Sequence, residues 1–219
     1  MKIKIIPTVF AENKKEFDER LFKTIKISDE IQIDFMDGKF VQGKSVKLSD
    51  VPNLKRFDKK FEAHLMINNP EKWIKRLKNK GFSKVIFHIK KYSKEKDVRW
   101  LINEIQKQDM EAFIAINPEV REEEVFHYLK QADGIMVMGI HPGKEHQKII
   151  HKTFYKTENI RKKDSEVVIQ IDGGVNSKNI RYLVKSGANI LNVGSFIANA
   201  ENPRIALKEL CKLAKEGQF

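Results

Sequence analysis

The sequence contains one cysteine, Cys211, among 219 residues. A single cysteine cannot form an intrachain disulfide or supply a cluster of thiolate metal ligands, so we expect a chain that folds in the reducing cytoplasm. No apolar run approaches the roughly 20 residues of a membrane span. The amino-terminal run Met1–Ile6 is interrupted by lysines and followed by Pro7. We therefore expect neither a signal peptide nor a membrane anchor.

Several motifs that would assign a function directly are also missing. The sequence has no G-x-G-x-x-G or Walker loop, no zinc-finger spacing, and no Ser-His-Asp or Cys-His arrangement for nucleophilic catalysis. Their absence argues against a dinucleotide-binding fold, a P-loop nucleotide hydrolase and a serine or cysteine hydrolase.

The chain is strongly basic, with a formal net charge of +12. Such a charge is compatible with a surface that binds nucleic acid or an anionic membrane. The excess is mostly lysine, dispersed along the predicted helices, and no basic run alternates with aromatic residues as a stacking platform requires. We favour a solvated, lysine-rich surface that attracts anionic metabolites, and expect no nucleic-acid or membrane partner.

Short apolar or β-branched runs alternate with longer amphipathic stretches along the chain. The runs predict eight strands, at Ile3–Ile6, Glu30–Phe35, Phe61–Met66, Lys84–Ile89, Glu111–Ile116, Gly134–Met138, Val167–Ile171 and Ile190–Val193. The longer stretches predict helices at Lys14–Thr24, Pro70–Lys80, Glu95–Gln108, Arg121–Gln131, Gln147–Lys162, Ser177–Ser186 and Pro203–Lys215. Only the connection at 45–57 lacks a helical pattern, with a possible turn near Leu48–Asp50. Eight such units predict a single-domain (β/α)₈ TIM barrel over residues 1–219.

Local signals agree with several of these boundaries. Asn69-Pro70 and Asn202-Pro203 each place a capping residue before a proline at the first helical position. Gly81 and Gly187 follow predicted helices, where a left-handed residue terminates the helix.

Polar residues collect at the predicted carboxyl ends of the strands, where α/β barrels carry their active sites. Gln32 and Asp34 are two positions apart on one strand, so both side chains point to the barrel interior. His64 and Asp172 end other strands. Two interior carboxylates repel each other and lose solvation, so their presence favours a cation site or proton transfer over an isolated buried polar group.

Glycines predict a neighbouring anion site. Gly173-Gly174 follow the seventh strand, and Gly194-Ser195 follow the eighth. Phosphate groups bind at these two loops in many such barrels, and a short helix starting near Ser195 would direct its positive end at the anion.

The remaining histidines and tryptophans are less informative. We expect His127 and His151 to be exposed on helices and His88 to be a hydrogen-bonded histidine of the barrel. His141 and His146, in the sixth loop, could contact a ligand. We expect Trp73 and Trp100 to pack in the core.

The motifs together resemble those of the ribulose-phosphate 3-epimerase family. They are Pro7-Thr8, Asp34–Val41, Glu62–Pro70, Asn117-Pro118, Met138–Gly143, Asp172–Val175 and Gly194-Ser195, and they span the chain. The resemblance implies a TIM barrel of the ribulose-phosphate-binding type, an isomerase of the pentose phosphate pathway and a homo-oligomer.

The resemblance also implies roles for individual residues. Asp34 and Asp172 would be the catalytic acid and base on opposite faces of the substrate C3. A divalent cation (zinc, iron, manganese or magnesium) would be held by these aspartates, His64 and the residue at position 32. Further contacts to the sugar phosphate would come from Thr8, His64, Met36, Met66, Met138, Gly143, Gly173, Gly174, Gly194 and Ser195.

Two positions depart from the family pattern. Gln32 stands where the family has a metal-binding histidine, and an amide oxygen is a poorer ligand for zinc. The sixth loop reads Pro142–Gln147, with charged residues in place of two glycines of the family's loop. These departures leave two hypotheses open: a metal-assisted epimerase of ketose phosphates, and a catalytically weakened barrel that binds a phosphorylated sugar or another anion without turnover. An aldolase or decarboxylase is disfavoured because no lysine stands at an interior carboxyl end of a strand.

Overall fold

The computed structural model describes residues 3–143 and 147–218 and contains a closed barrel of eight parallel strands. The strands are β1 (Lys4–Val9), β2 (Glu30–Met36), β3 (Lys60–Met66), β4 (Lys84–His88), β5 (Glu111–Ile116), β6 (Gly134–Met138), β7 (Ile169–Asp172) and β8 (Ile190–Val193). Each strand pairs with the next in sequence, and β8 closes the ring on β1. The predicted TIM-barrel fold is confirmed.

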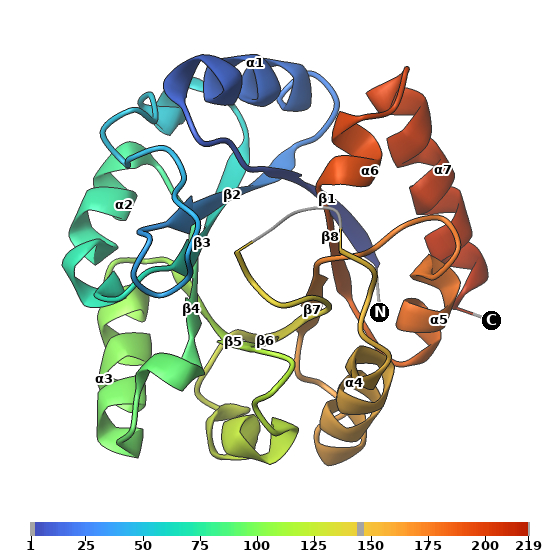
Figure 1. The fold of residues 1–219 in the computed structure, drawn as a ribbon. Coiled ribbons are helices and arrows are strands. Elements are labelled where there is room, and N and C mark those ends of the chain that lie inside the picture. Colours follow the sequence, from blue (N-terminus) through green and yellow to red (C-terminus); the bar gives the residue numbers. More distant parts are fainter. Residues whose placement is uncertain (1–2, 144–146, 219) are drawn as a thin grey trace.

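Helices surround the barrel on its outer side (Figure 1). They are α1 (Lys14–Thr24), α2 (Ile74–Lys80), α3 (Glu95–Gln106), α4 (Lys152–Lys163), α5 (Ile180–Lys185), α6 (Ser195–Ala198) and α7 (Pro203–Glu216). Short 3-10 helices occupy Leu54–Arg56, Pro70–Lys72, Ile89–Lys91 and Glu122–Tyr128. The connection between β2 and β3 has no α-helix, and its predicted turn at 48–50 is present.

The helix predicted at Pro70–Lys80 is divided into the 3-10 helix Pro70–Lys72 and α2, and the helix predicted from Ser177 begins at Ile180. Two further predicted helices differ more strongly. The segment predicted as a helix at 121–131 contains the 3-10 helix Glu122–Tyr128 and no α-helix. A hydrogen bond from α4 holds it in place, because the Asn159 side-chain amide donates to Glu122 at 2.6 Å. The helix predicted from Gln147 begins only at Lys152. Residues 147–151, which were expected to form its first turn, run along the barrel mouth instead, and the Ile150 N–H donates a hydrogen bond to the Gly139 carbonyl at 2.7 Å. In both places tertiary bonds override the helical pattern.

The residues predicted to begin and end helices are confirmed in part. Asn202 caps α7 by accepting a hydrogen bond from the Ile205 N–H, but the Asn69 side chain makes no capping bond. Gly81 and Gly187 have φ of +101° and +106°, the left-handed conformation that terminates a helix.

One tryptophan prediction is right and the other is wrong. Trp73 packs on the core with its ring 5.3 Å from that of Phe35. Trp100 is 52% exposed on the outer side of α3, whose buried face is formed by apolar neighbours such as Leu101 and Ile105. No helix within residues 3–143 and 147–218 is both long and apolar enough to cross a membrane.

The barrel interior has an apolar part and a polar part. Side chains that fill one side include Ile6, Ile86, Phe113, Met136 and Ile190. A second set is buried but polar, namely Gln32, Glu62, Lys84, Gln170 and Asn192. This polar set leads along the barrel to the carboxyl ends of the strands, where the candidate site lies.

Candidate active site

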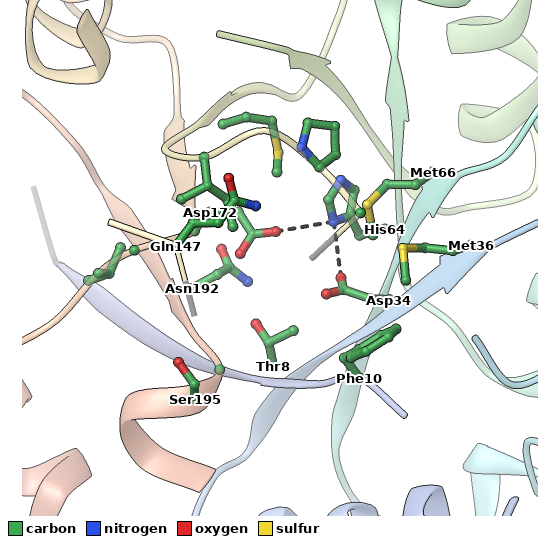
Figure 2. Close-up of a pocket in the computed structure, with 18 residues that line it drawn as sticks. Thr8, Phe10, Asp34, Met36, His64, Met66, Gln147, Asp172, Asn192 and Ser195 are labelled. Atoms are coloured by element: carbon green, nitrogen blue, oxygen red, sulfur yellow. Dashed lines mark hydrogen bonds and ion pairs between the residues drawn. The ribbon is translucent and has the colours of Figure 1, made fainter. Parts of the chain in front are cut away.

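A cavity opens at the carboxyl ends of the strands, as expected for this fold (Figure 2). It encloses about 700 Å³ of space including its open mouth, which suits a small metabolite. Every predicted catalytic or substrate-binding residue lines it: Thr8, Asp34, Met36, His64, Met66, Met138, Gly143, Asp172, Gly173, Gly174, Gly194 and Ser195. Gln32, predicted as a doubtful metal ligand, is buried just beneath its floor.

At the floor of the cavity, two carboxylates converge on one imidazole nitrogen. The strand register places Asp34 of β2 beside His64 of β3, while Asp172 comes from β7. The Nδ1 atom of His64 lies 3.0 Å from Asp34 Oδ1 and 3.1 Å from Asp172 Oδ2. Figure 2 shows the two carboxylates approaching this nitrogen from different directions.

Burial and mutual contact shift the pKa values in this cluster. Burial, together with the charge of Asp172, raises the pKa of Asp34 to about 6 against the hydrogen bond from His64. Burial alone would lower the pKa of His64, but its hydrogen bonds to Asp172 and Asp34 and their charges raise it to about 10. Without a cation, His64 is therefore protonated at neutral pH and bridges the two carboxylates.

The second nitrogen of His64 is held by a buried chain. His64 Nε2 lies 2.9 Å from His88 Nε2, and His88 Nδ1 lies 2.6 Å from the Asn117 side-chain oxygen. Burial and the neighbouring charge of His64 lower the pKa of His88 to about 3, so it stays neutral. Neutral His88 donates a hydrogen bond from Nδ1 to Asn117 Oδ1 and accepts one at Nε2 from the His64 Nε2–H group. The prediction that His88 is a hydrogen-bonded histidine of the barrel is confirmed. Its partners are Asn117 and His64, and His64 belongs to the candidate site.

The predicted cation site can be tested against these atoms. Ligand atoms of Asp34, His64 and Asp172 lie within 4.8 Å of one another. Two carboxylate oxygens and one imidazole nitrogen form a donor set that divalent zinc, iron and manganese accept. The chain through His88 keeps the proton of neutral His64 on Nε2 and leaves the Nδ1 lone pair toward the carboxylates. These three residues fit a divalent cation.

The glycines at the rim bring backbone close to the cavity. Gly174 has φ +71°, and a Cβ atom there would lie 2.8 Å from the Ile149 nitrogen. Gly194 and Ser195 begin α6, the short helix expected at this point. Close packing against Ile149 therefore requires glycine at position 174, and this backbone lines the cavity together with Ser195.

Some cavity residues were missed by sequence reasoning. Phe10 and Asn192 line the cavity, and Ile140, Pro142, Gln147 and Val175 complete its wall. Strand alternation could have found the first two, because Phe10 follows Thr8 by two positions and Asn192 precedes Gly194 by two. His141 is exposed and faces Glu119 at 3.7 Å rather than lining the cavity. His127 and His151 are exposed as predicted, and His146 lies outside the described residues.

The raised pKa values predict that the cation-free protein loses stability as pH rises. A group that holds its proton more tightly when folded stabilises the fold below its unfolded pKa and loses this effect as pH passes its folded pKa. For Asp34 this window runs from 3.8 to about 6, and for His64 from 6.5 to about 10. The melting temperature in a chelator should therefore fall between pH 7 and 10. In His64→Gln the fall over this range should be shallower, and equal curves for both proteins would contradict the assignment.

Sequence comparisons with known proteins agree on one family. The family model described as the ribulose-phosphate 3 epimerase family matches residues 4–198. Ribulose-phosphate 3-epimerase of Schizosaccharomyces pombe is 26% identical over 96% of this chain and 93% of its own. The cytoplasmic isoform from Oryza sativa is 27% identical over 98% and 96%. Among solved structures, KGPDC from Streptococcus mutans has a TM-score of 0.74 at 13% identity over 100% of both chains, which supports the fold.

Proposed function

Because this chain belongs to the ribulose-phosphate 3-epimerase family, it is a sugar-phosphate epimerase, and we propose that it interconverts D-ribulose 5-phosphate and D-xylulose 5-phosphate at C3. The observation that carries this proposal is the convergence of Asp34 and Asp172, from two strands, on one cavity. An epimerase that uses two bases needs one carboxylate on each face of the reacting carbon. Both carboxylates are present in this site.

The proposed chemistry is proton transfer next to a ketone. A C–H bond beside a carbonyl is a weak acid, and its conjugate base is an enediolate. One aspartate removes the proton from C3, and the other delivers a proton to the opposite face. Burial raises the pKa of Asp34 in the cation-free site, and a bound cation would lower it again, so that near neutral pH the carboxylate is free to accept a proton.

Asp34, His64 and Asp172 would hold a divalent cation in this proposal. When bound, the cation supplies positive charge that stabilises the developing oxyanion and facilitates deprotonation. Met36, Met66 and Met138 line the cavity wall, and in this proposal they exclude water from the reacting carbon. Thr8 adds a hydroxyl at the same floor.

The proposal places the phosphate at Gly173-Gly174 and Gly194-Ser195. Replacing Ser195 by aspartate should raise KM for the sugar phosphate about 10–100-fold, because a carboxylate would repel the phosphate, and each tenfold is worth about 1.4 kcal/mol. Ser195→Ala, of similar size but uncharged, should raise KM much less. Steady-state kinetics on both variants measures the difference. Equal KM values for the two variants would place the phosphate elsewhere.

Solvent exchange tests the proposed reaction directly. Incubated in D₂O with either pentulose 5-phosphate and a divalent cation, the enzyme should form the other epimer and incorporate deuterium at C3, as NMR would detect. A protein that binds the sugar phosphate without exchange under Mg²⁺, Mn²⁺, Fe²⁺ or Zn²⁺ would instead support the binding-only hypothesis.

A further inference from the structure

A chain of buried polar side chains runs through the barrel to the two aspartates. It begins with Lys84, whose Nζ atom is 2.9 Å from Glu62 Oε2. Glu62 Oε1 accepts hydrogen bonds from Gln170 Nε2 at 2.6 Å and from Asn192 Nδ2 at 2.8 Å. Asn192 Nδ2 also donates to Gln32 Oε1 at 2.8 Å. The four residues and Gln32 come from β2, β3, β4, β7 and β8 and are at most 6% exposed.

This chain has a direction that Glu62 sets. A carboxylate paired with Lys84 only accepts hydrogen bonds, so both amides beside it must present their nitrogen atoms. Gln170 Nε2 then also donates to Asn192 Oδ1 at 2.7 Å, which leaves Asn192 Nδ2 facing Gln32. The Gln32 side chain must therefore present its oxygen to Asn192 and its nitrogen to the other side.

On that other side, the Gln32 nitrogen meets both aspartates. Gln32 Nε2 donates to Asp34 Oδ1 at 2.9 Å and to Asp172 Oδ2 at 3.0 Å. Its two N–H groups thus bridge the carboxylates from below, while His64 Nδ1 contacts them at 3.0 and 3.1 Å. Two like charges are held close together by donors on two sides, which offsets their repulsion.

We propose that Gln32 is a positioning residue that holds Asp34 and Asp172 through hydrogen bonds from its amide nitrogen, and that it is not a cation ligand. The buried chain from Lys84 through Glu62, Gln170 and Asn192 fixes its orientation. A bound cation would then take its protein ligands from Asp34, His64 and Asp172, with Gln32 donating to the ligating carboxylates. This inference concerns the same aspartates and so rests on the proposed function.

The first test follows the Gln32 amide by NMR. In ¹⁵N-labelled protein, the side-chain signals of Gln32 are those that Gln32→Met removes. We expect them to exchange slowly with solvent and to remain protected when Zn²⁺ saturates the site, because the nitrogen keeps both carboxylate partners. Loss of this protection on Zn²⁺ binding would mean that the amide has turned to ligate through oxygen, which overturns the proposal.

The second test uses Co²⁺ in the place of the native cation, because its visible absorption bands depend on the ligand set. In the variant Gln32→Met, the methionine side chain is close in size to that of glutamine but has no amide. We expect its Co²⁺ spectrum to match that of the wild type, while kcat falls about 10–100-fold and KM changes little. A shifted spectrum in Gln32→Met would identify Gln32 as a ligand and overturn the proposal.

The third test reverses the direction of the chain. The double variant Glu62→Gln/Asn192→Asp has the same net charge, yet the group facing Gln32 now only accepts hydrogen bonds. Gln32 should turn its oxygen toward the aspartates, add a ligand to Co²⁺ and change the spectrum. Adding Gln32→Met to this double variant should restore the wild-type spectrum. A Co²⁺ spectrum that the swap leaves unchanged, in a protein that thermal unfolding shows to be folded, would refute control by the chain.

The proposed function can fail separately from this inference. If the wild type shows no exchange at C3 with any cation, the proposed reaction is wrong. The amide signals and Co²⁺ spectra still report which atom of Gln32 faces Asp34 and Asp172.

Discussion

Replacing Asp172 by asparagine should strongly slow epimerisation but leave proton exchange on one of the two epimers. Asp34 remains in this variant and can remove the C3 proton on its own face and return a deuteron from solvent to the same face. The opposite face has no base, so the configuration does not change. We expect kcat for epimerisation to fall by about 10²–10⁴-fold, the usual contribution of a general acid or base.

Asp34→Asn is the matched variant, and it should retain exchange on the other epimer. Asparagine keeps an oxygen that can accept from Gln32 and His64, so both variants preserve the contacts of the cluster. Each purified pentulose 5-phosphate is incubated in D₂O, and deuterium at C3 is measured by NMR. If one variant exchanged both epimers at the wild-type rate, two-base proton transfer would be wrong.

Removing divalent cations should slow the reaction by about 10²–10⁴-fold, since a cation at an oxyanion contributes several kcal/mol and each 1.36 kcal/mol is tenfold in rate. Dialysis against a chelator and then against metal-free buffer gives the cation-free enzyme. Adding Mn²⁺, Fe²⁺, Zn²⁺ or Mg²⁺ separately should restore activity to different degrees and so identify the preferred cation. Undiminished activity after chelation would contradict a cation at Asp34, His64 and Asp172.

Cation affinity should also depend on pH. The pKa of His64 is about 10 without a cation, so a cation must displace the proton on Nδ1 to gain this ligand. Between pH 7 and 9 the affinity should rise, by at most tenfold per pH unit for a single displaced proton. Calorimetry in buffers of different ionisation enthalpy would measure the released proton directly. His64→Gln should bind more weakly and release no proton from this position.

Several features of the site were accessible from the sequence because they depend on near neighbours. Gln32 and Asp34 share a face because strand residues two apart always do, and the strands around Asp34, His64 and Asp172 were recognisable from apolar runs. Closure of eight such strands then brings their carboxyl ends to one mouth, whatever the details of packing. The cavity residues at the strand ends, such as Asp34, His64 and Asp172, follow from these two rules.

Other features depend on contacts between distant segments. The 3-10 helix Glu122–Tyr128 and the late start of α4 at Lys152 follow from bonds across the structure. Trp100 was expected in the core beside Leu101, but the helical spacing of the buried residues of α3 leaves its side chain on the outer face. The local pattern contains the exposure of Trp100 but not the first two choices.

By itself, the sequence determined the strand and helix alternation, the barrel, and the arrival of two aspartates and a histidine at one mouth. Only the tertiary structure decided how their hydrogen atoms are distributed. Which atom of Gln32 faces the aspartates depends on Lys84, Glu62, Gln170 and Asn192, and His64 is held through His88. A hydrogen bond has a direction, and in a buried chain that direction is set by the charged group at its far end, which lies on another strand.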